Sequence, residues 1–238
     1  MPLPKPPVPT YELTVPSTGK TIKYRPFLVK EEKVLLIAME SEDEKMIRDA
    51  VIDILKNCVL TRGVKVEQFA MFDIEYIFLK IRSKSVGERV EMNLLCKDDN
   101  ETRVNYELDL ESVQVNFPEG HDKKIMLSES EGIIMKYPGF EQFIKTQILQ
   151  KNPSTEEVFE IVIDCVNQIF SGDEVWEAST TSKKEISEYI EGLTTAQFEK
   201  IQKFFITMPK LSHNITIKNP NTGVESEYEI EGLVNFFA

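Results

Sequence analysis

Hydrophobic residues recur with two different periods along this chain of 238 residues, and stretches of the two kinds alternate. Apolar residues spaced at i, i+3, i+4 and i+7 indicate the buried face of a helix, whereas strict alternation around a polar turn indicates a β-hairpin. Hairpin patterns occur near the beginning, in the middle and near the end of the chain, with helical patterns between them. We therefore expect an α+β fold that is mainly helical, with small antiparallel β-hairpins at these three places, set apart from the helices.

Each expected hairpin consists of two extended stretches around a polar turn. The paired stretches are residues 11–15 with 21–27, 90–95 with 102–110, and 214–218 with 225–230. Shorter extended stretches follow the middle hairpin at residues 113–117, 123–127 and 132–137. The dipeptide Pro138-Gly139 then ends the middle region, because proline and glycine favour turns.

Several helix starts are marked by a serine or threonine followed three residues later by glutamate or glutamine, the pattern of a capping box. It occurs at Ser41, Ser154, Ser182 and Thr194. The apolar pattern that begins after Ser154 continues through Ile169 and predicts one helix that ends at Gly172. The expected helices cover residues 31–40, 41–58, 66–84, 139–150, 154–171, 182–191 and 194–207.

The order of these stretches suggests how the chain is organised. Residues 1–10 are rich in proline and are expected to form an extended arm, either disordered in isolation or lying along a partner. A division near residue 138 gives a region of hairpins and helices, 11–137, and a C-terminal helical region, 138–238, that ends in a hairpin. A single domain is the alternative, because a chain of this length can share one core.

Charge and composition argue against several kinds of function. The net charge of −12 disfavours binding to the phosphate backbone of nucleic acids. No apolar stretch approaches the roughly 20 residues that span a bilayer, so we expect no membrane segment. The three cysteines, Cys58, Cys96 and Cys165, are too few for a disulfide framework and fit a reducing cytoplasm.

The sequence contains no residue pattern for catalysis or for binding a cofactor. Gly-Lys-Thr at 19–21 resembles the end of a phosphate-binding loop, but Thr14 stands where that loop needs a glycine, and strands flank the turn. His121 and His213 are not paired at a metal-binding spacing, and His121 is expected to be a solvated loop residue. We therefore expect no catalytic residue, no cofactor and no enzymatic activity. A cell-wall hydrolase is the rival hypothesis, and it requires a positioned acid or metal.

The last fifth of the chain resembles a known family most closely. Residues 186–237 look like the C-terminal block of baseplate hub proteins of T-even-like, contractile-tailed bacteriophages, a group that includes the hub or central spike subunit and a hub assembly factor. Residues 13–20 with 24–27, and the predicted helix at 67–84, resemble the same family. The resemblance implies a late structural protein of the virion tail that takes part in baseplate assembly.

The resemblance also implies partners and a location. The expected partners are other baseplate hub and tail proteins, with no nucleic acid and no membrane, and self-association is left open. The expected location is the virion tail baseplate, and the host cytoplasm during assembly. The alternative is a transient chaperone for the baseplate hub or the tape-measure assembly, which would be absent from the mature virion.

Related hub proteins carry a C-x-x-C-G zinc knuckle in the final hairpin, and some carry another in the middle hairpin. In this chain Asn219 and Thr222 stand at the cysteine positions of the final hairpin, and the middle hairpin keeps Cys96 with Asp99. One thiol, one carboxylate and two neutral side chains form a poor zinc site. The resemblance therefore implies hairpins that are retained and a metal that is lost.

The C-terminal residues Leu233, Val234, Phe236 and Phe237 put four large apolar side chains at one end of the chain. They either pack back onto the helices or form a docking patch for another protein, because exposed aromatic clusters mark interfaces. They are the protein-interaction candidates of this sequence.

Overall fold

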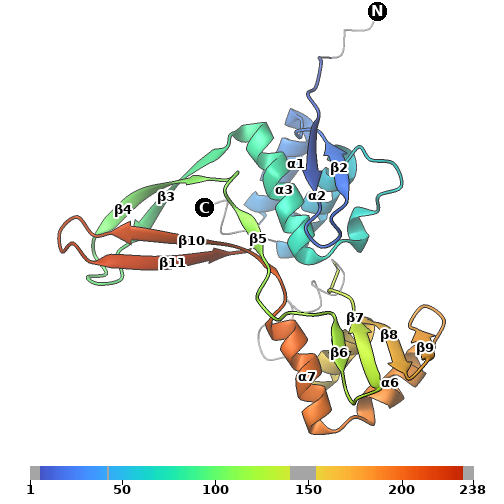
Figure 1. Ribbon diagram of the computed structural model, residues 1–238. Helices are drawn as coiled ribbons and strands as arrows, with labels where there is room; N and C mark the ends of the chain where they lie inside the picture. Colours follow the sequence, from blue (N-terminus) through green and yellow to red (C-terminus); the bar gives the residue numbers. More distant parts are fainter. Residues whose placement is uncertain (1–5, 42, 140–153, 233–238) are drawn as a thin grey trace, which may run out of the picture. The chain divides into compact units, whose positions relative to one another are not determined.

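A computed structural model describes residues 6–41, 43–139 and 154–232 of the chain. It divides into two compact units, unit 1 (Met1–Asn116 and Lys210–Ala238) and unit 2 (Phe117–Pro209). The described residues form six α-helices and 11 β-strands in four sheets (Figure 1). The prediction of a mainly helical fold is therefore wrong, because the chain mixes helix and sheet in both units.

Unit 1 begins with a β-hairpin and a group of helices. β1 (Tyr11–Thr14) pairs with β2 (Thr21–Tyr24), as expected from the sequence. The helical segments are α1 (Val29–Glu40), α2 (Glu44–Cys58), the short 3-10 helix η1 (Val66–Gln68) and α3 (Met71–Val86). Ten of the 16 residues of α3 are buried, so this helix lies in the core of unit 1.

The start of α2 differs from the expected capping box at Ser41. Asp43 caps the helix instead, and its carboxylate accepts hydrogen bonds from the backbone N–H groups of Lys45 and Met46. The hydroxyl of Ser41 donates to the carbonyl of Ala38 and so belongs to the end of α1. Serine and aspartate both cap helix starts, and the prediction chose the wrong one of two residues that lie two positions apart.

The other strands of unit 1 form two longer hairpins that share a core with α3. β3 (Arg89–Leu95) pairs with β4 (Arg103–Asp109), and β10 (Lys210–Lys218) pairs with β11 (Glu225–Glu231) and also with β5 (Gln114–Asn116). Leu79 of α3, Leu108 of β4 and Ile215 of β10 lie in one buried cluster. The middle and final hairpins are thus parts of a common core and are not set apart from the helices.

Unit 2 contains a four-stranded antiparallel sheet with helices on one face (Figure 1). The strand order is β6 (Lys124–Met126), β7 (Glu131–Met135), β8 (Val166–Ser171) and β9 (Glu174–Glu177). The helices are α5 (Thr155–Asp164), α6 (Lys183–Glu191) and α7 (Thr195–Ile206). The predicted capping boxes at Ser154, Ser182 and Thr194 are all present.

The helix predicted at 154–171 is wrong in its second half. α5 ends at Asp164, and the chain continues as β8, a two-residue turn and β9. These two unpredicted strands contribute to the error in the fold class. The helix predicted at 139–150 lies almost entirely outside the described residues.

Unit 2 is inserted into unit 1 between two paired strands. Asn116 at the end of β5 and Lys210 at the start of β10 are direct partners in the antiparallel pairing. The chain therefore leaves unit 1 and returns to it at adjacent positions. The domain boundary drawn from the sequence at residue 138 stays a prediction.

Candidate functional site: joined hairpin tips and exposed apolar surfaces

The tips of the middle and final hairpins are joined by side-chain hydrogen bonds. The amide nitrogen of Asn219 donates to both carboxylate oxygens of Asp98, each at 3.1 Å, and to Oδ2 of Asp99 at 2.9 Å. The Thr222 hydroxyl donates to Asp98 at 2.5 Å. Asn219 is fully buried, so its amide needs these partners to offset the loss of water.

The degenerate knuckle positions are therefore brought together. Asp99 accepts further hydrogen bonds from the hydroxyl and backbone N–H of Thr102, which is the main reason why its pKa lies below the ordinary value. The hydrogen bond from Thr222, followed by that from Asn219, lowers the pKa of Asp98. Two adjacent carboxylates thus stay ionised and hold the amide of Asn219 between them. Sequence reasoning missed Asp98, because it lies between the two expected ligand positions.

Cys96 points into the core below this joint and is fully buried. Burial raises the pKa of its thiol, and the neighbouring Asp98 and Asp99 act in the same direction. A protonated, enclosed thiol is a poor metal ligand. Among the described residues, no group of three or more histidine, cysteine and acidic side chains could hold a metal ion. The loss of the metal stays a prediction, and metal analysis of the pure protein tests it.

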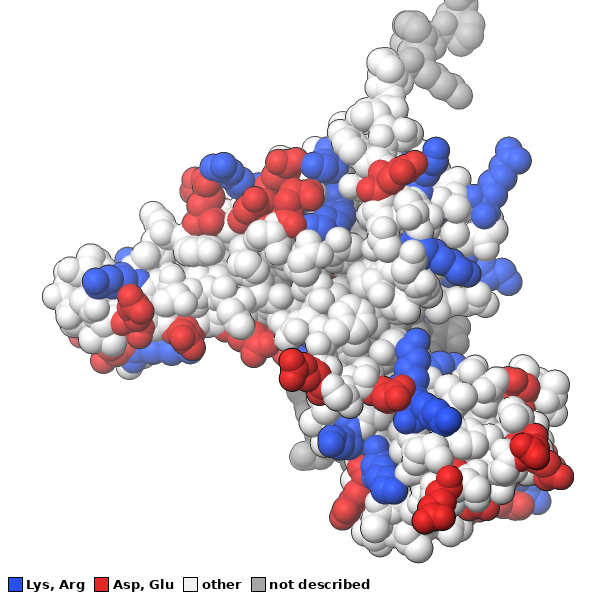
Figure 2. Space-filling model, in the orientation of Figure 1, with Lys and Arg blue, Asp and Glu red and all other residues white. Residues whose placement is uncertain are grey.

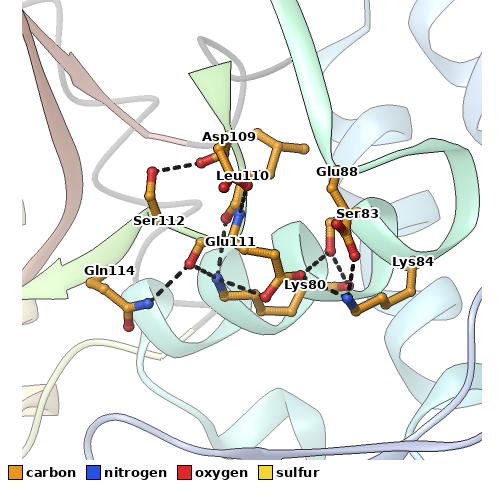
Figure 3. Close-up of polar contacts among 9 residues, drawn as sticks. All are labelled: Lys80, Ser83, Lys84, Glu88, Asp109, Leu110, Glu111, Ser112 and Gln114. Carbon is orange, nitrogen blue, oxygen red and sulfur yellow. Dashed lines mark hydrogen bonds and ion pairs between the residues drawn. The ribbon is translucent and has the colours of Figure 1, made fainter. Parts of the chain in front are cut away.

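A buried lysine links α3 to the turn after β4 (Figure 3). The Lys80 ammonium donates to the carbonyl oxygens of Leu110 at 3.1 Å and Glu111 at 2.8 Å, and lies 5.3 Å from the ring centre of Tyr76. The carboxylate of Glu111 lies 3.7 Å from Lys80 and accepts from Ser83 at 2.7 Å. Burial lowers the pKa of Lys80, while Glu111 opposes the shift. Because the ammonium group of Lys80 already binds the turn after β4, its role is to hold this turn against α3.

His121 lies in a loop of unit 2, as expected, but it is half-buried and hydrogen-bonded. Its Nδ1 is 2.9 Å from the hydroxyl of Thr207, and its Nε2 is 3.1 Å from the hydroxyl of Tyr137. The Thr207 hydroxyl donates to the carbonyl of Lys203, so its oxygen accepts from Nδ1–H. The ring also stacks on Phe204. The expectation of a solvated histidine is therefore wrong.

Large exposed apolar side chains gather on α1. Helix α1 is apolar on its buried side and also on the side that faces solvent, and its hydrophobic residues do not follow one stripe. The exposed members are Val29, Val34, Leu36, Ile37 and Met39. One apolar side of α1 is buried in unit 1, and the other is exposed and can bind a partner.

The second apolar surface lies on the sheet of unit 2. The cross-strand partners Met126, Gly132, Phe170 and Val175 form one row across the sheet. The next row, on the opposite face of the sheet, consists of Ile125, Ile133, Ile169 and Trp176. Its first three residues are buried in the core of unit 2. Val175 is 56% exposed and Trp176 is 43% exposed.

β9 is an edge of this sheet, and all four of its residues are exposed. Tryptophan is enriched among the interface residues that contribute most of the binding energy. An edge strand has backbone N–H and C=O groups that can pair with a strand of another protein. Glu174 and Glu177 flank the two apolar residues, and charges at an edge oppose pairing with an identical edge. The edge therefore suits a different protein better than a second copy.

The predicted interaction residues Leu233, Val234, Phe236 and Phe237 lie outside the described residues, so their role stays a prediction.

On the face seen in Figure 2, acidic and basic side chains are interspersed, with uncharged areas between them. None of the described helices is long and apolar enough to cross a membrane.

Comparison with known proteins gives one match. The family model described as T4 bacteriophage base plate protein matches residues 8–238, which is nearly the whole chain. No curated protein and no solved structure matches the chain. The exposed apolar surfaces agree with a protein that works among other subunits. The chain belongs to the T4 bacteriophage base plate protein family.

Proposed function

We propose that the chain is a baseplate hub subunit that takes part in assembly through contacts with other hub and tail proteins. The observation that carries the proposal is the apolar edge of unit 2, where Val175 and Trp176 are exposed on an edge strand. The protein meets its partners in the host cytoplasm and remains in the tail baseplate. It performs no chemical step, and its driving force is the burial of apolar surface, about 25 cal/mol per Å².

The register of the sheet supports docking at β9. Ser171 and Glu174 close a two-residue turn and face each other, so the backbone groups of Val175 point away from β8. An extended segment of a partner pairs with Val175 and packs apolar side chains against Trp176. Basic residues in that segment complement Glu174 and Glu177.

The experiment compares Val175→Glu with wild type in cells infected by a phage that lacks its own copy. We expect the variant to lose at least tenfold in co-purification with hub components, because a charged carboxylate in place of Val175 cannot be buried against the apolar side chains of the partner. Val224→Glu is the matched control, since Val224 is 47% exposed in the turn of the final hairpin. Circular dichroism checks that both variants fold.

The same preparation distinguishes the two roles of the protein. A hub subunit is present in purified mature particles as well as in assembling hubs. A transient chaperone is found with assembling hubs and is absent from mature particles. If neither fraction contains the protein, the proposed function is wrong.

A further inference from the structure

The outer side of α1 carries apolar residues along its whole length. Val29 is 80% exposed, Leu36 is 52% exposed and Ile37 is 49% exposed. The buried side of the helix consists of Glu31, Leu35 and Ala38. Because a helix advances 100° per residue, Val29, Leu36 and Ile37 lie opposite that buried side. Val34 and Met39 are also exposed and lie on the flanks.

Two charged residues share this outer side. Lys33 and Glu40 are exposed and fall at the i+4 and i+11 positions relative to Val29. We call Val29, Lys33, Leu36, Ile37 and Glu40 the outer stripe of α1. Its basic residue lies in the first half, its acidic residue is the last residue of the helix, and the apolar pair lies between them.

This arrangement is complementary to itself when the helix is reversed. In an antiparallel pair of outer stripes, Lys33 of each copy lies within one turn of Glu40 of the other, and the Leu36–Ile37 pairs meet near the centre. In a parallel pair, lysine faces lysine and glutamate faces glutamate, which is repulsive. We propose that two copies of the chain associate through the outer stripes of α1 in an antiparallel, twofold arrangement.

The positions of Lys33 and Glu40 along the helix are the reason to propose that a second copy of the chain binds the outer stripe. A twofold interface uses the same patch on both subunits, so the patch must complement itself. The surrounding residues agree, since Lys30 is exposed near the start of α1 and Asp43 is exposed just after its end. A single pair of short helices buries less than the roughly 1,200 Å² typical of stable complexes, so the dimer is weak and concentration-dependent.

The inference goes beyond the proposed function and does not depend on it. Self-association is measured on the isolated full-length protein by sedimentation velocity over a wide range of concentrations. We expect the wild type to change from monomer to dimer as concentration rises. Leu36→Glu abolishes the change, and Leu60→Glu, at an apolar residue outside α1 that is 45% exposed, preserves it.

A charge exchange tests the antiparallel geometry. Lys33→Glu and Glu40→Lys each place like charges opposite one another in their own homodimers and weaken them about threefold or more. When the two variants are mixed, each restores opposite charges for the other, and the heterodimer recovers wild-type affinity to within about twofold. A merely structural role of either residue does not produce recovery on mixing.

Any one of the following results overturns the proposal. These are a wild type that stays monomeric at every concentration, equal effects of Leu36→Glu and Leu60→Glu, and no recovery when the charge variants are mixed. A chain that ends at Gly232 and dimerises where the full chain does not also overturns it, because the C-terminal segment is then the occupant of the stripe.

Discussion

Asn219 is a residue whose local hydrogen bonds join two distant parts of the sequence. Its amide nitrogen serves Asp98 and Asp99, and its amide oxygen accepts from the backbone N–H groups of Asn221 and Thr222. Replacement by alanine removes every one of these side-chain bonds at a fully buried position. We expect Asn219→Ala to destabilise the protein by about 1–3 kcal/mol in chemical denaturation.

The neighbouring Asn221 provides the matched control. Its side chain is exposed and donates a hydrogen bond to the hydroxyl of Thr102 at 3.0 Å. We expect Asn221→Ala to change the stability by less than about 0.5 kcal/mol. Equal effects of the two substitutions contradict the assignment of Asn219 as the centre of the joint.

His121 predicts a pH dependence of stability. Burial lowers its pKa from the ordinary 6.5, Lys123 acts in the same direction and Asp122 opposes it. The unfolded chain therefore takes up the proton first, so the stability contributed by the neutral ring is complete above about pH 6.5 and is lost as the pH falls below that value. We expect wild type to lose more stability between about pH 7.5 and pH 5.5 than His121→Gln does.

Urea denaturation at the two pH values measures this difference. If His121→Gln and wild type lose stability equally over this range, the buried histidine does not contribute to the pH dependence.

Some of the residues of the joint could be predicted from the sequence. The resemblance to hub proteins picked out Cys96, Asp99, Asn219 and Thr222, and the structure places these residues at or below one joint. It did not predict the role of Asp98, nor that of Lys80, whose partners lie 30 residues away. Such partners are set by tertiary contacts, and no local pattern reveals them.

The sheet of unit 2 depends on a glycine beneath an aromatic ring. A methyl group at Gly132 would lie 2.4 Å from Cζ of Phe170 and 2.5 Å from the carbonyl oxygen of Ile125. The ring of Phe170 on β8 lies over Gly132, its partner on β7. Such a pair of glycine and aromatic residue helps to determine the register of a sheet. We expect Gly132→Ala to cost about 1–3 kcal/mol, because the backbone oxygen cannot move without disturbing β6.

Thermal and chemical denaturation measure the effect, and Gly192→Ala is the control. A methyl group at Gly192 meets its nearest atoms at 3.4 Å and 3.5 Å, an ordinary contact, and the residue has a helical backbone. We expect this change to stay within about 0.5 kcal/mol of wild type. A harmless Gly132→Ala contradicts the close packing of Phe170.

The strands β8 and β9 show one reason why the fold class was predicted incorrectly. The apolar residues Val162, Cys165, Val166 and Ile169 fit a helical period, yet only Val162 lies in α5. Ile169 is buried because it pairs with Ile133 of β7, more than 30 residues earlier in the chain. A short apolar run fits a helix and a strand equally well, and only the distant partner decides between them. Capping boxes were predicted better, because their contacts are local.

At the scale of the whole molecule, unit 2 is an insertion whose ends meet. Since Asn116 and Lys210 are paired, a turn of about four residues can replace residues 117–209. We expect unit 1 to remain folded after this replacement, with cooperative unfolding and protected amides in β10. Circular dichroism and hydrogen exchange measure both properties.

The complementary fragment, residues 138–238, tests the boundary predicted from the sequence. It separates β8 from β7 and β10 from β5, so we expect it to be poorly folded and prone to aggregate. Cooperative unfolding of this fragment would support the boundary at residue 138. An unfolded unit 1 after the replacement shows that the two units depend on each other for stability.

The insertion also determines how the molecule responds to tension. A pull on the two chain termini reaches residues 117–209 only after the pairing between β5 and β10 has separated, because both connections leave from that pair. Strands pulled apart one bond at a time yield at lower force than strands sheared along their length. The inserted unit is therefore shielded from a pull on the termini until that short pair has separated.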